Sequence, residues 1–386
     1  MRESSESPSD LGSEASPAQN GGAAPSAALG VRRLFAIAVF AAVLGFGITL
    51  SFGYADHAPR PHGVRIAVAA PLAVRSYVAA GLERAQPGGF DVVGVGTAQA
   101  AYRSVYSQST AGALIVPPSG PITMVTASAE GLTQKQAVTK ALTAASAAMH
   151  RTAKALDVAP LPPGDSTGLS SFVFGLGLLL PSVIGSIGIF LLGMRFRLWW
   201  RVAAATLFAL LAAVGGVLAL DTILGALTGA GAALIGIGFL GALSFVLFIA
   251  ALQAVVGLPG TALAAVAFVF VGNAVSGGTV PIGFLPDGFR QVAPWLPNNA
   301  LIRGARDVVY FNGHDLGHPL LVLALWPAVA MVVLAAVDLL HVSERRRTPR
   351  LAQDIYRTPA IVHLGRRLET HRSHTGTTPA APLPST

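Results

Sequence analysis

A very long stretch without charged side chains limits the folds that this chain can adopt. Residues 222–286 contain no Asp, Glu, Lys or Arg over 65 consecutive positions, and four shorter runs also lack them: 34–53, 169–194, 202–220 and 316–337. A helix that crosses a hydrocarbon core of roughly 30 Å needs about 20 residues of this kind. The pattern predicts six membrane-spanning helices, two of them from the longest run.

The amino-acid composition differs from that of soluble globular proteins. Charged residues make up 11% of the chain and hydrophobic residues 53%, whereas soluble globular domains are about one quarter charged. The chain has no cysteine, which excludes disulfides, iron–sulfur clusters, a thiol nucleophile and Cys-based zinc sites. We therefore expect the lipid bilayer to be a main partner of this chain.

Arginine clusters predict the topology. They flank alternate ends of the apolar runs: Arg32 and Arg33, then Arg195, Arg197 and Arg201, then Arg345, Arg346 and Arg347. The positive-inside rule places all three clusters, and both termini, in the cytoplasm. The expected location is the plasma (inner) membrane, with a multi-pass topology. A cleaved signal peptide is the alternative for residues 34–53, but that run exceeds the usual core of about 7–15 residues.

Residues 64–151 alternate between strand and helix patterns. Strands are predicted over residues 64–69, 90–95, 112–116 and 122–127, with helices over 74–85, 98–107 and 133–151, and with Thr97 and Thr133 as helix caps. The predicted fold class is an α-helical polytopic membrane protein with six transmembrane helices and a small extracytoplasmic α/β domain between helices 1 and 2. The expected segments are a disordered lead (1–33), helix 1 (34–53), the α/β domain and its Pro-rich linker (54–168), a five-helix membrane domain (169–341) and a basic cytoplasmic tail (342–386).

No motif in the chain predicts enzymatic chemistry. A phosphate-binding loop needs a lysine after a glycine at a helix start, and none of the three lysines, Lys135, Lys140 and Lys154, follows a glycine. His314 and His318 have metal-ligand spacing, but Pro319 suits the first turn of the last helix, which leaves His318 as its cap and His314 outside the helix. We expect no catalytic residue, metal or cofactor in this chain. The basic tail favours contact with lipid headgroups over nucleic acid.

Two acids and several rows of small residues remain within the apolar runs. Asp221 and Asp338 are predicted at the ends of helices near the membrane surface, with a proton relay as the alternative. Small residues recur four positions apart at Gly225, Gly229 and Ala233, at Ala232 and Gly236, and at Gly238 and Ala242. Such rows allow close helix approach in lipid, so a homodimer is one interpretation.

The loop predicted between helices 5 and 6, residues 276–316, is apolar but interrupted by Gly and Pro. Its motifs are Ser276-Gly277-Gly278-Thr279-Val280-Pro281, Leu285-Pro286, Leu296-Pro297 and the pair Arg303 and Arg306. Irregular backbone is not tolerated against lipid. The loop is predicted to form two short re-entrant or interfacial helices, with Trp295 and Tyr310 at headgroup level. An ordinary external loop is the alternative.

These motifs resemble the corresponding loop of type-2 ABC transporter permeases, particularly the phage-infection-protein-like branch, which has an external domain between helices 1 and 2. The resemblance covers residues 34–341. It implies a permease subunit, usually dimeric, that exports an apolar or amphipathic compound and uses ATP through a separate ATPase subunit. It also assigns a gating or translocation role to the loop residues Ser276, Gly277, Gly278, Pro281, Pro286, Pro297, Arg303 and Arg306.

The connection between helices 2 and 3 departs from that family. Well-coupled members have an acidic docking segment there, whereas this chain has a basic and aromatic one. Its candidate contacts with a cytoplasmic partner are Arg195, Arg197, Trp199, Trp200 and Arg201, and it looks more like an interfacial anchor. The alternative function is therefore a non-transporting membrane scaffold or receptor whose external domain binds a cell-envelope partner.

Overall fold

The structure, a computed structural model, describes residues 27–56, 59–193 and 196–356. It divides into two units, Met1–Thr49 and Leu50–Thr386. The described part of the first unit lies in helix α1 (Ala27–Asp56), which covers the predicted first span and begins within the segment predicted as the lead. Residues 1–26 of that lead and residues 357–386 of the predicted tail lie outside the described residues.

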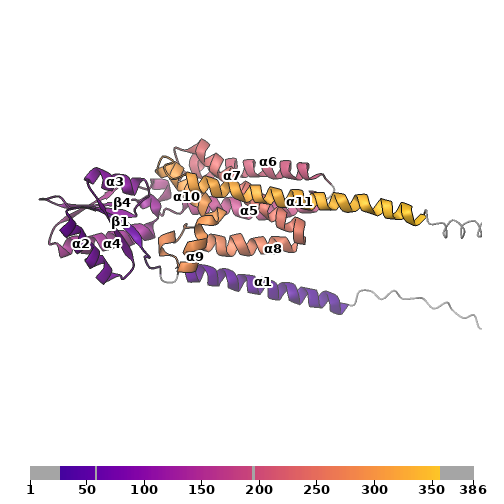
Figure 1. The fold of residues 1–386 in the computed structure, drawn as a ribbon, viewed down its shortest axis with the longest axis horizontal. Coiled ribbons are helices and arrows are strands. Elements are labelled where there is room, and N and C mark those ends of the chain that lie inside the picture. The colour runs from indigo at the N-terminus through magenta and orange to yellow at the C-terminus, as the bar shows by residue number, and fades with distance from the viewer. Residues whose placement is uncertain (1–26, 57–58, 194–195, 357–386) are drawn as a thin grey trace, which may run out of the picture. The chain divides into compact units, whose positions relative to one another are not determined.

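The α/β domain is built on a five-stranded mixed sheet in the order β2-β1-β3-β4-β5 (Figure 1). β1 pairs in parallel with β2 and β3, β3 pairs antiparallel with β4, and β4 pairs in parallel with β5. The strands are β1 (Val64–Ala69), β2 (Phe90–Val95), β3 (Gly112–Ile115), β4 (Ile122–Thr126) and β5 (Ala153–Asp157). The four predicted strands are confirmed. β5 was not predicted, because it is a short edge strand with mostly exposed side chains.

Helices cover both faces of the sheet. α2 (Leu72–Ala85) and α4 (Leu132–Ala148) lie on one face and α3 (Ala98–Tyr106) on the other, as Figure 1 shows. Alternate strand residues supply the two cores: Ile66 and Leu114 pack towards α2 and α4, whereas Ala67 and Ala113 pack towards α3. This is the two-residue side-chain period of a strand buried on both sides.

The helix ends of this domain confirm one predicted cap and correct the other. The Thr97 hydroxyl accepts a hydrogen bond from the Ala100 N–H at 3.1 Å, as expected for an N-cap. The second helix starts at Leu132, after Gly131, instead of being capped by Thr133. Gly131 has φ +119°, a conformation that favours glycine, and it links the short helix η1 (Ser128–Glu130) to α4.

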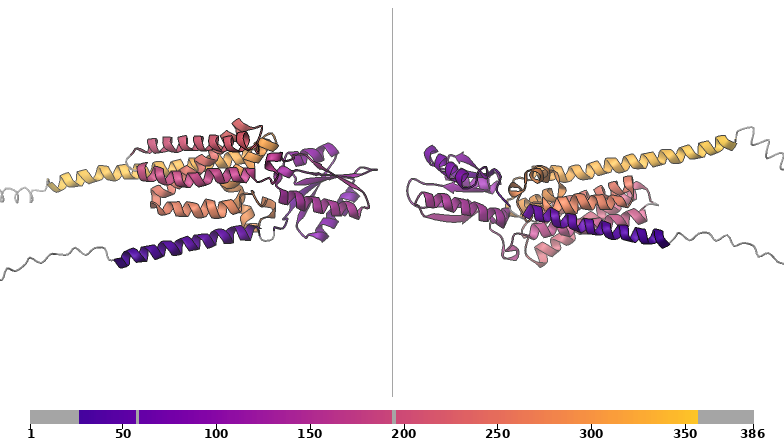
Figure 2. Two further views of the ribbon diagram at one scale, coloured as in Figure 1. Left: turned by 180° about the vertical axis from the view of Figure 1, so that it is seen from behind. Right: turned by 90° about the horizontal axis from the view of Figure 1, so that it is seen from below.

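Four helices are long and apolar enough to cross a membrane. They are α5 (Ser170–Gly193), α6 (Leu198–Val217) with its π-helical extension η3 (Leu218–Ile223), α7 (Gly231–Val256) and the part of α11 up to Leu340. α7 is the central helix and contacts α5, α6 and α11. Figure 2 shows the apolar helices of this unit from behind and from below. The sequence predicts six spans, and the described residues contain four helices with the length and composition of a span.

The 65-residue uncharged run contains one full-length helix and one short one. After α7 it forms α8 (Pro259–Ala265), which continues into the π-helical segment η4 (Val266–Gly272). Fourteen residues at about 1.5 Å each rise only about 21 Å, less than the roughly 30 Å of a hydrocarbon core. The rest of the run folds into the loop that contains η5 (Ile282–Phe284).

The predicted loop contains two short helices, as expected. α9 (Asp287–Val292) leads through η6 (Ala293–Trp295) into α10 (Pro297–Tyr310), most of whose residues are buried. α11 (Gly317–Tyr356) begins just before His318, so this residue lies in the first turn instead of capping it, and the helix continues beyond the predicted boundary at residue 341.

The rows of small residues lie in different environments in the structure. Gly225 and Gly229 have φ of +62° and +94° and lie in the turn before α7, so they do not form a helical row. A Cβ on Gly238 would lie 2.7 Å from the Phe174 ring of α5, so this glycine serves packing inside the chain. Ala232 and Gly236 are exposed.

Candidate functional site

Arg306 of α10 lies at the centre of the predicted loop. Its guanidinium donates hydrogen bonds to the carbonyl oxygens of Gly277 at 2.7 Å and Gly278 at 3.1 Å, and to the hydroxyl of Ser171 at 3.0 Å. The residue is only 7% exposed. Longer contacts of 3.5 Å reach the carbonyl oxygens of Glu130 and Gly168. One cation thus joins the loop, the start of α5, its preceding linker and the α/β domain.

The Ser-Gly-Gly turn is shaped to present these carbonyl groups. The Ser276 hydroxyl donates to the Asn273 carbonyl at 2.7 Å and accepts from the Gly278 N–H at 3.2 Å. Gly277 has φ +76°, which favours glycine. A Cβ on Gly278 would lie 2.3 Å from the Phe172 ring. The turn therefore needs both glycines, one for its backbone conformation and one for space.

The charge of Arg306 is balanced without a direct ion pair in the described residues. Burial lowers the pKa of Arg306, and the negative charges of Glu130 and Asp165 partly offset this effect. Burial raises the pKa of Glu130, against the opposing attraction of Arg306 and Arg303. One carboxylate oxygen of Glu130, Oε1, is buried without a hydrogen-bond partner. Such a buried ionisable group is costly unless it is neutralised or paired.

Tyr310 ties the linker to α10. Its hydroxyl donates to Asp165 Oδ2 at 3.1 Å, while Asp165 Oδ1 accepts from the Ser170 N–H at 3.1 Å. Asp165 ends the short helix η2 (Pro163–Asp165) and is buried. Burial and the neighbouring Asp165 carboxylate raise the pKa of Tyr310. The hydroxyl is thus held by an acid of the linker. Trp295, in contrast, is 55% exposed.

A pair of asparagines at the start of α10 extends the polar network. Asn298 Nδ2 donates to the Phe268 carbonyl and to Asn273 Oδ1, both at 3.1 Å, and Asn299 Nδ2 donates to the Ser276 carbonyl at 2.9 Å. Phe268 lies in the π-helical segment η4, where the altered helical ladder allows a side chain to take a backbone carbonyl. α10 is thereby fastened to the helix before the loop.

The far end of α10 docks on α3. Phe311 is fully buried against the Tyr106 ring, with ring centroids 6.0 Å apart. Gln108 Nε2 donates to Asp307 Oδ1 at 3.1 Å, and the Asp315 N–H donates to Asp307 Oδ2 at 2.9 Å. We call the set of contacts from Glu130 and α3 to α10 and the Ser-Gly-Gly turn the junction.

The structure brings together half of the predicted loop residues. Ser276, Gly277, Gly278 and Arg306 form the centre of the junction. Pro281, Pro286 and Pro297 each begin or precede a short helix, a position that suits their fixed φ. Arg303 points elsewhere and forms an ion pair with Asp315. Junction residues that the sequence did not predict are Glu130, Asp165, Ser171, Asn298, Asn299 and Asp307.

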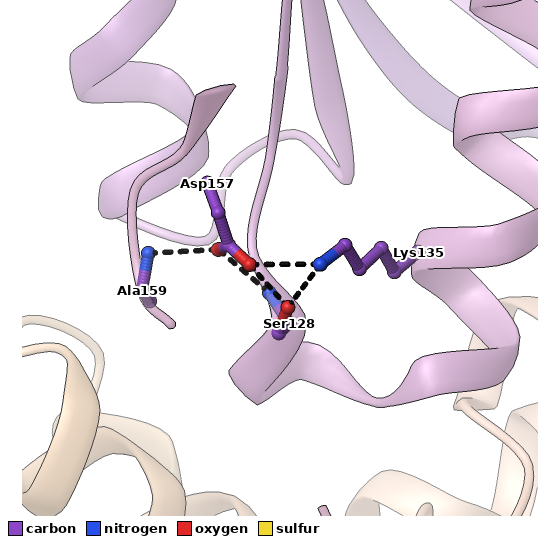
Figure 3. Close-up of polar contacts among 4 residues, drawn as sticks. All are labelled: Ser128, Lys135, Asp157 and Ala159. Atoms are coloured by element: carbon purple, nitrogen blue, oxygen red, sulfur yellow. Dashed lines mark hydrogen bonds and ion pairs between the residues drawn. The ribbon is translucent and has the colours of Figure 1, made fainter. Parts of the chain in front are cut away.

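A second polar cluster holds η1 in place (Figure 3). Asp157, at the end of β5, accepts from the Ser128 N–H at 3.0 Å, the Lys135 ammonium at 2.9 Å and the Ala159 N–H at 3.2 Å, and also from the Ser128 hydroxyl. Burial opposes ionisation of Asp157, but the hydrogen bonds from Ser128 and Lys135 outweigh it and lower the pKa.

Lys135 also contacts the Ser128 hydroxyl at 2.5 Å, which is a pairing used by some serine nucleophiles. Ser128 is only 4% exposed, however, and its hydroxyl is committed to Asp157. We interpret the cluster as a structural clamp that positions η1, and with it Glu130, against Arg306.

The predicted cytoplasmic contact segment is partly helical. Arg195 lies outside the described residues. Arg197 precedes α6, and Trp199, Trp200 and Arg201 belong to its first turn, so part of the predicted connection is helical. Trp199 and Trp200 are 68% and 61% exposed.

Within the described residues, no group of three His, Asp or Glu side chains could hold a metal ion. His314 Nδ1 lies 2.6 Å from the Phe311 carbonyl oxygen.

Comparison with known proteins gives no matching family model, no matching curated protein and no matching solved structure. The fold and the junction define an α/β domain fastened to a set of long apolar helices.

Proposed function

We propose that this chain is the membrane permease subunit of an ABC-type exporter for an apolar or amphipathic compound, energised by a separate ATPase. In this proposal the chain crosses the inner membrane six times, with both termini in the cytoplasm and the α/β domain outside. α1 supplies the first crossing, and α8 with η4 supplies the short fifth one.

The observation that carries the proposal is the junction around Arg306. An exporter with an external domain needs that domain to move together with the helices that open the path. Arg306 joins the start of α5, the Ser-Gly-Gly turn and the backbone of Glu130 through one buried guanidinium. The hydrophobic core is also continuous, since Phe284 and Leu285 of the loop pack with Val78 and Leu82 of α2.

The short fifth crossing is compatible with the bilayer because the chain after it is buried in protein. Irregular backbone at membrane depth is tolerated only in that case. Residues 274–276 after η4 are buried, and so are Val280, Phe284 and Leu285. The side chains of Asn298 and Asn299 satisfy carbonyl groups of this region.

Affinity purification of the full chain in a mild detergent tests the energy source. We expect a nucleotide-binding ATPase to be recovered with the chain, and substitution of Trp199 and Trp200 together by alanine to reduce that recovery. The matched control is Trp295→Ala, which removes an exposed tryptophan from the loop at the opposite end of the proposed topology. Repeated recovery of the chain without any ATPase would contradict the proposal.

The short connection between α5 and α6 favours a second candidate, a non-transporting scaffold or receptor. α5 ends at Gly193 and α6 begins at Leu198, which leaves little chain for an ATPase to dock on. This candidate predicts that a photoreactive residue at the exposed Ser119 crosslinks a cell-envelope protein in intact cells. It also predicts that no ATPase is recovered.

A further inference from the structure

A large groove lies between α2 and α4, on the sheet face opposite α3. Its volume is about 710 Å³, within the range of about 300–1,000 Å³ that is typical of small-molecule sites. Val78 and Leu82 of α2 and Phe90 of β2 contribute apolar surface, and Phe284 of the loop contributes more. None of the polar clusters described above uses this groove.

Small side chains keep the groove open. Gly81 of α2 lines it, and a Cβ added there would meet no atom within 4 Å. The facing wall of α4 presents alanines, among them Ala141, Ala144 and Ala145. The larger residues of α4, Val138 and Leu142, are fully buried in the core instead. The two helices are therefore separated by an apolar space that their own side chains do not fill.

The charges along the groove have a single sign. Arg84 of α2 and Lys140 of α4 line it, and none of the lining residues is acidic. Arg84 uses Nε to donate to the Ala80 carbonyl of its own helix, and neither cation forms an ion pair in the described part of the chain. Glu83, the neighbouring acid, accepts from the Gly88 N–H at 3.1 Å.

We propose that this groove binds an amphiphile with one hydrocarbon chain and an anionic headgroup. Apolar walls suit the hydrocarbon chain, and Arg84 and Lys140 provide the complementary charge for a carboxylate or phosphate head. The groove is also lined by Phe284, which belongs to the loop that follows the apolar helix α8–η4, so a ligand from the bilayer surface has a short route to it. This binding function goes beyond the proposed transport and does not depend on it.

Photo-crosslinking of the full chain in phosphatidylcholine nanodiscs tests the proposal. The probe is a palmitic acid analogue with a diazirine on its chain, and the comparison probe is the corresponding alcohol. We expect the acid to label peptides of α2 and α4, and Gly81→Leu, which fills the groove, to reduce that labelling several-fold. Ala80→Leu is the matched control, because Ala80 is exposed on the same helix and does not line the groove.

The double variant Arg84→Gln with Lys140→Gln tests the headgroup. It should reduce labelling by the acid to the level of the alcohol, whereas Arg103→Gln on α3 should leave it unchanged. If Gly81→Leu does not fold, as judged by its thermal unfolding, Ala144→Leu fills the groove from the opposite wall. Labelling confined to the apolar helices, or insensitive to both filling variants, would overturn the proposal. Equal labelling by acid and alcohol would overturn its anionic part.

Discussion

At the scale of single residues, Arg306 shows how a buried cation can be satisfied by neutral groups. Its bonds go to two backbone carbonyls and one hydroxyl, while Glu130 and Asp165 act at longer range. The sequence predicted Arg306 because of its place in the loop motif. It could not predict Glu130 or Ser171, because these residues reach Arg306 only after more than a hundred intervening residues have folded.

Arg306→Met should destabilise the protein strongly. The variant removes the donors for the carbonyls of Gly277 and Gly278 and for the Ser171 hydroxyl. Hydrogen bonds to a charged group are each worth about 1.5–3 kcal/mol, so we expect a loss of at least that size in thermal or denaturant unfolding in detergent. Arg303→Met is the matched control: its ion pair with Asp315 is partly exposed, and such pairs contribute about 0–1 kcal/mol. Equal losses in both variants would contradict the assigned role.

Asp157 should make stability depend on pH in the acid range. Its pKa is lowered in the folded state, so its contribution is present above the unfolded pKa of about 3.9. This contribution is lost as the pH falls through the lower folded value. The unfolding temperature of Asp157→Asn should therefore lie below that of the original chain at pH 7, and the difference should shrink towards pH 3. The matched control is Asp91→Asn, which removes an exposed carboxylate of β2.

At the scale of elements, local pattern determined most helices and strands, and tertiary contacts changed their ends. The four strands β1 to β4 and the short loop helices were predicted, whereas β5 was missed and α4 starts at Leu132, after Gly131, without a cap from Thr133. In the described residues, the fifth predicted span corresponds to the shorter apolar helix Pro259–Gly272. The uncharged run alone could not show where a helix stops and a buried loop begins, because both are apolar.

Two glycines of α7 provide a direct test of helix packing. Gly238→Ala should destabilise, since its Cβ would lie 2.7 Å from the Phe174 ring, and overpacking of this kind costs about 1–3 kcal/mol. Gly236→Ala should be neutral or stabilising, because a Cβ there meets no atom within 4 Å and alanine is the better helix former. Unfolding midpoints in detergent measure both changes. A loss at Gly236 alone would indicate that the small residues serve a contact between chains instead.

At the scale of the whole molecule, the proposed topology can be tested cleanly because the chain has no cysteine. Ser119→Cys, in the turn between β3 and β4, should react with a membrane-impermeant maleimide in intact cells. Phe196→Cys, between α5 and α6, should react only after lysis. The opposite pattern would reverse the topology, and reaction of both in intact cells would rule out the crossing by α5.

Charge distribution and side-chain periodicity are local properties of the chain, so the sequence alone predicted the apolar segments and the four strands β1 to β4. It also placed Ser276, Gly277, Gly278 and Arg306 in one loop. Three features are visible only in the folded protein: the contacts of Arg306 with Glu130 and Ser171, the hydrogen bond from Asn298 to a π-helical carbonyl, and the open groove between α2 and α4. These features depend on contacts between distant segments, whose geometry is set by packing and not by neighbouring residues.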